Sequence, residues 1–194
     1  MATGRKAPVR AALAGAVIFW VLAAPAPARA ELRISNLAVF LNDFAVTVHV
    51  VLFGAVPESL YDSLQTGIPA HVRTRVELWQ HQRLLPDRRV QSRTVERQIT
   101  YNVLTKEYKV VSLKNEHREP YLTKDLREAR RVISEFRVGN LIGASSLNPK
   151  ELYYVRAQSA VSLGGVNSWL ARFTGEAEET DWVRSSLLTL TRSQ

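Results

Sequence analysis

The chain has 194 residues, a formal net charge of +8, 46% hydrophobic residues and no cysteine. This composition is typical of a globular protein and excludes a disordered or collagen-like chain. The lack of cysteine excludes a disulfide framework, a thiolate metal site and a cysteine nucleophile. No stretch reaches the roughly 18 consecutive apolar residues that predict a membrane-spanning helix.

The first 30 residues have the three parts of a secretory signal peptide. A basic start is followed by the apolar stretch Ala11–Ala24 and by the small-residue pattern Ala28-Arg29-Ala30. As a helix, these 14 apolar residues rise about 21 Å, which is too short for a retained anchor in a hydrocarbon core of roughly 30 Å. We therefore expect cleavage before Glu31 and export, with the periplasm as the destination. Residues 31–194 keep a net charge of +4, because the removed segment holds four cations and no acid.

We expect residues 31–194 to form a single β-rich domain, because they contain no linker, low-complexity tract or repeat. Apolar alternation predicts a strand over 32–41, with a break near Ser35-Asn36, and a second strand over 44–53. Asn42-Asp43 predicts the turn between them. The second strand is apolar on both faces, which is typical of a central strand that is covered on both sides.

A short helix and a long hairpin are predicted next. Pro57 is placed as a first helical residue and Gly67 as a C-terminal cap. Alternation resumes over 68–84 and over 88–104 on either side of the turn signal Pro86-Asp87, so these segments predict an antiparallel hairpin. Each arm would extend roughly 50 Å, which exceeds the diameter of about 40 Å expected for a domain of this size. The hairpin must therefore bend, coil or project.

The rest of the chain predicts further strands and one more helix. We expect a helix with Thr123 as its N-cap and Phe136 as its last residue, and strands over 107–113, 138–142, 152–163 and 182–190. The total is about eight strands and two helices, with mostly hairpin-like connections. The predicted fold is mainly β, either an antiparallel β-sandwich or a strongly curved sheet, with two packed helices.

Two motifs resemble a known family. They are Leu60-x-x-x-Leu64-x-x-Gly67-Ile68-Pro69 and, after two long predicted strands, Tyr101-Asn102-x-Leu104-Thr105-x-x-Tyr108. Together with the N-terminal segment, the length and the Trp-containing tail, they resemble the exported proteobacterial proteins grouped as domain-of-unknown-function family 4390. The resemblance implies export and a shared β-rich domain, and it implies neither an activity nor catalytic residues.

Catalytic and metal-binding motifs give no candidate site. The chain has no nucleophile elbow, zinc-protease helix motif, phosphate-binding loop or dinucleotide fingerprint. His71 and His81 fall roughly 33 Å apart on one predicted strand, so they cannot share a metal ion, and we expect structural histidines. The acidic stretch Glu176–Asp181 lacks the spacing of a calcium loop. We therefore predict that the chain is not an enzyme and that it binds no cofactor and no metal.

The long hairpin carries the candidate site. Its half next to the turn is polar and rich in arginine, whereas its half near Tyr101 alternates with apolar residues. We predict that the projecting part binds an anionic partner. The candidate residues are Arg83, Arg88, Arg89, Arg93 and Arg97. Arg97 interrupts the apolar row, so it needs a bulge or a partner carboxylate. The competing interpretation is a solvated edge whose charges prevent aggregation.

Three classes of function stay open. The first is an exported, non-enzymatic module that contacts an envelope protein or an anionic lipid or polymer. The second is a periplasmic carrier of an apolar or lipid ligand, because a curved sheet covered by a helix can enclose a cavity. The third is a hydrolase with an unfamiliar site. Nucleic acid is disfavoured as a partner, because export is expected and no aromatic platform accompanies the arginines.

Overall fold

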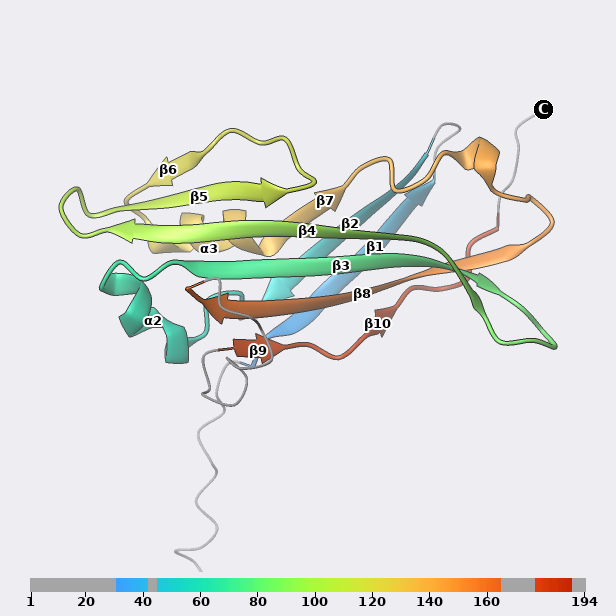
Figure 1. Ribbon diagram of the computed structural model, residues 1–194, viewed down its shortest axis with the longest axis horizontal. Helices are drawn as coiled ribbons and strands as arrows, with labels where there is room; N and C mark the ends of the chain where they lie inside the picture. Colours follow the sequence, from blue (N-terminus) through green and yellow to red (C-terminus); the bar gives the residue numbers. More distant parts are fainter. Residues whose placement is uncertain (1–30, 42–44, 165–176, 190–194) are drawn as a thin grey trace, which may run out of the picture.

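The structure is a computed structural model that describes residues 31–41, 45–164 and 177–189 (Figure 1). Within these ranges the chain forms ten strands, two α-helices and one short 3-10 helix. The strands are β1 (Arg33–Leu41), β2 (Val46–Phe53), β3 (Ala70–His81), β4 (Arg88–Asn102), β5 (Glu107–Lys114), β6 (Tyr121–Thr123), β7 (Glu135–Val138), β8 (Leu152–Leu163), β9 (Ala177–Glu179) and β10 (Val183–Arg184). The helices are α2 (Glu58–Gln65), α3 (Leu126–Ser134) and the 3-10 helix η2 (Ala144–Ser146).

The strands form two antiparallel sheets that pack on each other. The small sheet has the order β1-β2-β7, and the large sheet has the order β10-β8-β3-β4-β5-β6, with β9 paired to β8. β1 and β2 cross the strands of the large sheet obliquely (Figure 1). Val50 of β2 and Val72 of β3 belong to one buried apolar cluster, which joins the two sheets. The prediction of a mainly β, antiparallel fold with few helices is confirmed.

The alternation of the sequence places the core where it is predicted. The five even-numbered residues of β3 from Ala70 to Leu78 are fully buried. β2 lies between β1 and β7, as expected for a central strand. Its second face is only half-buried, because Thr47, His49 and Val51 keep partial exposure. The small sheet is therefore covered on one face by the core and partly open on the other.

The break predicted in the first strand is a β-bulge. The register between β1 and β2 shifts between Ile34 and Asn36. Ser35 donates a hydrogen bond from its hydroxyl to the Val51 carbonyl at 3.0 Å, which anchors the extra residue to β2. The predicted turn at Asn42-Asp43, together with the first predicted residue of the next strand, lies outside the described residues.

The helix α2 buries two leucines against the core. Leu60 and Leu64 are almost fully buried. Pro57 is the N-cap rather than the predicted first helical residue. Gly67 follows the helix with a φ of +93°, a left-handed conformation that favours glycine, and its N–H donates to the Leu64 carbonyl at 2.9 Å. The predicted helix end is thus correct, and the predicted start is displaced by one residue.

The predicted helix from Thr123 to Phe136 is too long at both ends. α3 begins after Asp125, whose carboxylate accepts a hydrogen bond from the Arg127 N–H at 2.8 Å. The helix ends at Ser134. Asp125 caps the helix because its short side chain reaches the free N–H groups of the first turn, two residues later than the predicted cap.

Phe136 belongs to β7 and not to the helix. It lies opposite Val50 of β2 and is buried in the core. Its spacing fits both a helical face and the alternation of a strand, and the pairing with β2 decides between them. The predicted strand over 138–142 is therefore wrong, since the observed strand is Glu135–Val138.

The C-terminal strand predicted over 182–190 is also wrong in length. β10 pairs two residues with β8, and Leu188 then forms an isolated bridge with Tyr153. Leu187 is exposed, so the tail follows the edge of β8 without an alternating buried face; residue 190 lies outside the described part. Two strands were not predicted, β6 and β9, because three residues are too few to show alternation.

Replacing Asp125 with alanine removes the acceptor at the first turn of α3. We expect the free energy of unfolding to fall by about 1 kcal/mol. Asp125→Asn keeps an acceptor of similar reach and should keep most of the stability. Urea unfolding followed by circular dichroism measures both variants, and an unchanged Asp125→Ala protein would contradict the assignment of this N-cap.

Candidate functional site

The arginine-rich hairpin of β3 and β4 rests on a third strand. β3 pairs with β8 along its whole length, Ala70–His81. Its pairing with β4 contains a register shift between Leu78 and Trp79, which is a bulge. The large sheet is twisted, and the turn of the hairpin lies at one extreme of the long axis of the molecule (Figure 1). Both strands are shorter than the predicted arms 68–84 and 88–104, and only the turn, residues 82–87, extends beyond the paired strands.

A buried carboxylate lies on the outer face of this hairpin. Glu77 is 1% exposed. Its oxygens accept hydrogen bonds from Trp79 Nε1 at 2.9 Å, from Arg89 at 3.3 Å and from Arg156 at 2.7 Å. Burial acts to raise the pKa of Glu77, but the hydrogen bonds from Arg156 and Trp79 outweigh it and leave the pKa lowered. The negative charge is therefore fixed and shielded from solvent.

Aromatic rings cover the same cluster and attach the C-terminal segment to it. The guanidinium of Arg156 lies between two indole rings, 4.2 Å from the centroid of Trp79 and 4.3 Å from that of Trp182. Next to it, the Arg184 guanidinium lies 3.5 Å from the ring centroid of Tyr154. Such cation–π contacts are stabilising. The sequence pattern did not predict this cluster, although Trp182 and Arg184 in the tail were a signal for it.

Two of the five predicted arginines lie near the turn without an acidic partner. Arg83 is exposed in the turn and contacts no hydrogen-bonding or charged group among the described residues. Arg88 is exposed and donates two hydrogen bonds, of 3.2 and 2.9 Å, to the neutral side-chain oxygen of Gln80. Both guanidinium groups therefore keep an uncompensated positive charge.

Two further predicted arginines make contacts within the fold. Arg89 pairs with Glu77, although its side chain stays 58% exposed. Arg93 donates to the carbonyls of Gly139 and Asn140 at 2.7 and 2.9 Å, beyond the end of β7. Arg93 thus joins the large sheet to the small one, and its role is first of all structural.

Arg97 is buried, and it contradicts its predicted place in the binding surface. Its side chain is 1% exposed. The guanidinium forms a bidentate pair with Glu116, with N···O distances of 2.5 and 2.6 Å. It also donates to the carbonyls of Val132 and Glu135 at 2.5 and 2.6 Å. The ring centroid of Phe136 lies 4.4 Å from the guanidinium carbon. An external partner cannot reach this side chain.

The environment of Arg97 confirms the compensation that its sequence position requires. A charged residue in an apolar row predicts either a bulge or a partner carboxylate, and both are present. The register of β4 with β5 shifts between Glu96 and Arg97, and Glu116 supplies the carboxylate. The residue was correctly singled out as unusual, but its function is internal.

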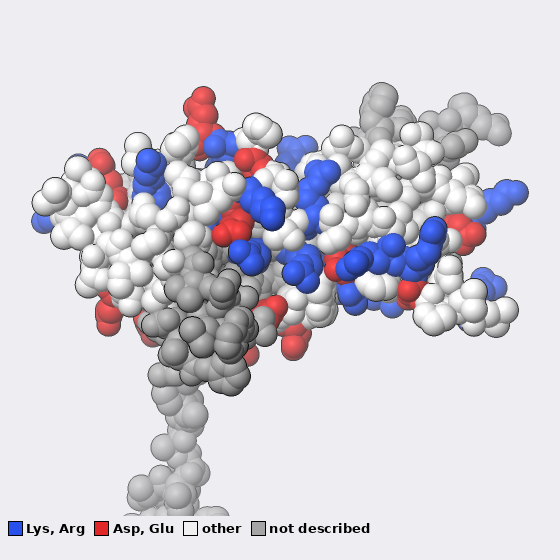
Figure 2. Space-filling model, viewed as in Figure 1, with Lys and Arg blue, Asp and Glu red and all other residues white. Residues whose placement is uncertain are grey.

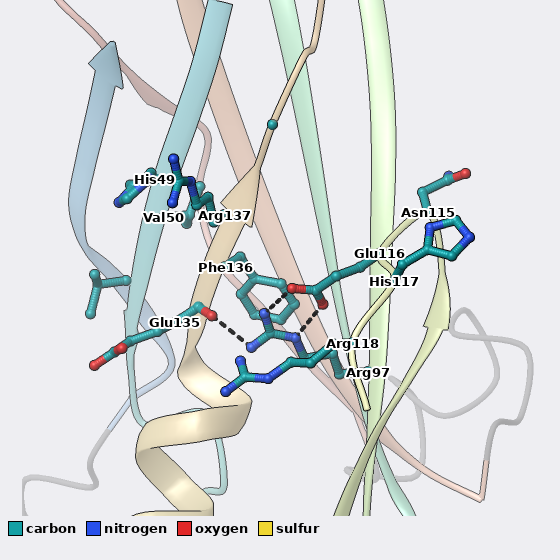
Figure 3. A pocket seen from close by; sticks show the side chains of 12 residues that line it. His49, Val50, Arg97, Asn115, Glu116, His117, Arg118, Glu135, Phe136 and Arg137 are labelled. Carbon is teal, nitrogen blue, oxygen red and sulfur yellow. Dashed lines mark hydrogen bonds and ion pairs between the residues drawn. The ribbon is translucent and has the colours of Figure 1, made fainter. Parts of the chain in front are cut away.

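A surface pocket of about 600 Å³ lies beside the ion pair of Arg97 and Glu116 (Figure 3). Arg118 and Arg137 are among its lining residues. Burial acts to raise the pKa of Glu116, but hydrogen bonds from Arg97 and Ser112 outweigh it and lower the pKa. Glu116 therefore stays ionised at neutral pH and accepts hydrogen bonds, which does not suit a general acid.

The histidines that the sequence analysis tested have structural partners. His71 Nδ1 lies 3.3 Å from Glu96, and His81 Nδ1 lies 3.0 Å from Asp87. Across residues 31–41, 45–164 and 177–189, no three His, Asp or Glu side chains gather into a group suited to a metal ion. None of the helices in this part of the chain has the length and hydropathy needed to cross a membrane.

Comparison with known protein families gives a match. The model of a family described as Domain of unknown function (DUF4390) matches residues 29–182. The matched range contains both sequence motifs and confirms the resemblance inferred from them. No curated protein and no solved structure matches the chain significantly.

The pair of Arg97 and Glu116 predicts a dependence of stability on pH. The folded-state pKa of Glu116 lies below its ordinary value of 4.5. The pair is therefore fully stabilising above that value, and its contribution is lost as the pH falls through the folded-state pKa. Glu116→Gln leaves the buried charge of Arg97 without its carboxylate, so we expect the free energy of unfolding to fall by about 3 kcal/mol at pH 7. On acidification, the free energy of unfolding of this variant should fall less than that of the wild type.

Urea unfolding of both proteins between pH 7 and pH 3 measures this difference. Glu119→Gln is the matched control, because Glu119 is exposed in the same loop and forms no hydrogen bond or ion pair with the described residues. Equal acid sensitivity in the wild type and the Glu116→Gln variant would show that the pair does not stabilise the fold.

Proposed function

The chain belongs to the DUF4390 family, and from this premise we propose that it is an exported, non-enzymatic module that binds an anionic component of the cell envelope through the β3–β4 hairpin. The family supplies no activity, so the proposal is argued from the side chains of this chain. The family match begins at residue 29, so residues 1–28 of the predicted signal peptide precede the matched domain, as expected for an exported protein.

The observation that carries the proposal is the internal use of the acidic groups around the hairpin. Glu77 is buried beneath Arg89, Arg156 and Trp79. Glu96 is shared by His71 and Arg73, with distances of 3.3 and 3.0 Å. Because these carboxylates are already bound, they do not neutralise the other arginines of the hairpin.

Three arginines of the β3–β4 hairpin remain without an acid. Arg75, Arg83 and Arg88 are exposed and form no ion pair with the described residues. Lys and Arg gather in a band over β3, β4 and β8 that runs toward the end of the hairpin (Figure 2). A guanidinium presents a rigid fork of donors that matches a phosphate or carboxylate group. The band therefore suits an anionic surface or chain better than a small neutral ligand.

The acidic groups of the site favour binding over catalysis. Glu77 and Glu116 both have a lowered pKa and are held by arginine. A general acid or base at neutral pH needs a pKa closer to the working pH and a free position beside the substrate. These two carboxylates instead have the environment of structural counter-ions.

The apolar carrier gains no support from the pocket beside Arg97. The pocket is lined by charged side chains such as Arg118, Glu135 and Arg137, which are exposed to solvent. A site for an apolar ligand is lined mainly by hydrophobic and aromatic groups. We therefore do not propose this pocket as a lipid cavity.

Export with cleavage predicts the mass of the purified protein. Expressed with its own N-terminus in a bacterial host, the chain should be recovered from the periplasm as residues 31–194. Ala30→Phe places a bulky residue at the cleavage pattern and should leave the precursor uncleaved. Native mass spectrometry measures both; recovery of the full 21.8 kDa chain from the wild-type gene would contradict cleavage. A mass excess that disappears on denaturation would favour a carrier instead.

Reversing the charge of the exposed arginines should weaken binding to a polyanion. Heparin–agarose is the probe, because it presents dense anionic groups without an apolar phase. We expect Arg83→Glu combined with Arg88→Glu to lower the affinity about tenfold at roughly 0.1 M salt, since each reversal replaces attraction with repulsion. The salt concentration at elution measures this change.

The control for this experiment lies at the opposite turn. Lys106→Glu combined with Lys109→Glu changes the net charge by the same amount. Lys106 is exposed in the turn between β4 and β5, and Lys109 is exposed within β5. This variant should elute close to the wild type. Wild-type elution of the double arginine variant, or an equal shift in the lysine variant, would overturn the proposal that the hairpin is the anionic-partner surface.

A further inference from the structure

The turn of the β3–β4 hairpin, residues 82–87, presents an apolar tip. Leu84 is 96% exposed and Leu85 is 68% exposed. Pro86, beside them, is exposed as well. The turn between β4 and β5 also exposes two neighbouring apolar residues, Val103 at 55% and Leu104 at 93%, but Lys106 and Glu107 follow them and no arginine flanks them. Exposed apolar residues between arginines that lack an acidic partner indicate a contact with a partner that is both apolar and anionic. The proposed function uses the arginines and leaves Leu84 and Leu85 unexplained.

Hydrogen bonds at the base of the turn hold the tip in place. The Asp87 carboxylate accepts a hydrogen bond from the Gln82 N–H at 3.0 Å and another from the Tyr154 hydroxyl at 2.9 Å. His81 Nδ1 lies 3.0 Å from the same carboxylate. Tyr154 belongs to β8, so the turn is tied to the third strand. The tip is therefore presented by a built support and does not extend freely into solvent.

The arginines that flank the tip are positively charged and have no acidic partner. Arg83 directly precedes the two leucines and Arg88 follows the turn, and neither meets a carboxylate in the described residues. Asp87 directs its charge to the base of the turn, where the hydrogen bond from Gln82 contributes most to its lowered pKa. Lys150 and Glu151 in the neighbouring segment carry opposite charges. The tip thus combines an apolar end with a basic flank.

We propose that this tip docks the protein on an anionic lipid bilayer, with Leu84 and Leu85 in the membrane interface and Arg83 and Arg88 on lipid phosphates. The inference rests on the proposed function and identifies its anionic component as a bilayer surface. Aliphatic side chains gain free energy when they leave water, and arginine is attracted to anionic headgroups. A bilayer offers an anionic surface directly above an apolar phase, whereas a soluble polyanion would leave the leucines in water.

The first experiment follows the tip directly. Because the chain has no cysteine, Leu84→Cys and Leu104→Cys each allow one environment-sensitive dye to be attached. Leu104 is the matched control: it is 93% exposed in the turn between β4 and β5. On addition of phosphatidylcholine vesicles containing one quarter phosphatidylglycerol, we expect the dye at position 84 to shift to shorter wavelength and the dye at position 104 to stay unchanged.

The second experiment separates the leucines from the arginines by vesicle sedimentation. We expect Leu84→Ser combined with Leu85→Ser to weaken binding to the anionic vesicles at least about tenfold and to leave heparin binding unchanged. Arg83→Glu combined with Arg88→Glu should weaken binding to both probes. Val103→Ser combined with Leu104→Ser should change neither, and vesicles of phosphatidylcholine alone should bind less of every protein. All proteins carry the same N-terminus, so differences between them belong to the substituted turns.

The outcomes distinguish this inference from the function on which it rests. Heparin binding that depends on the arginines, with vesicle binding that does not depend on the leucines and no spectral shift at position 84, would overturn the bilayer and leave the anionic-partner proposal intact. Loss of arginine dependence on both probes would overturn both. Equal effects of the substitutions at positions 84–85 and 103–104 would also overturn the tip as the docking site.

Discussion

The buried guanidinium of Arg97 is the interaction on which the relation between the two sheets depends. It extends from β4 of the large sheet to the carbonyls of Val132 and Glu135, where α3 passes into β7 of the small sheet. Glu116 closes the set from the loop after β5. A buried charge is costly unless it is paired and hydrogen-bonded, so these segments are held in the one arrangement that satisfies it. Other arrangements of the sheets would leave the buried charge of Arg97 unpaired, so this residue favours one packing of the sheets.

The same rule divides the charged residues of the hairpin into two groups. Glu77 and Glu116 each pair with arginine within the fold, so the charges of Arg89, Arg156 and Arg97 are compensated internally. Arg83 and Arg88 differ from Arg97 only in what surrounds them: no carboxylate of the described residues reaches them, and solvent does. The binding surface that we propose thus consists of arginines that have no carboxylate partner within the fold.

Periodicity in the sequence accounts for much of the fold. The alternation that marks β3 and β8 follows directly from one buried face, and the row interrupted by Arg97 requires the compensation that is found. Periodicity does not account for Phe136, because its spacing fits both a helix and a strand. Its pairing with Val50 of β2, far away in the sequence, determines that it belongs to a strand. The site was less predictable for the same reason. Whether an arginine is free depends on contacts such as that of Glu77 with Arg156, which lies 79 positions away.

Arg93 and Arg97 have one more consequence, for contacts between copies of the chain. β7 is an edge strand of the small sheet, and the unpaired carbonyls of an edge are a template on which another molecule can add a strand. Arg97 occupies the Glu135 carbonyl at the start of β7, and Arg93 occupies those of Gly139 and Asn140 just beyond its end. An incoming strand would have to displace two anchored guanidinium groups. The arginines that join the sheets therefore also close this edge to β-sheet aggregation.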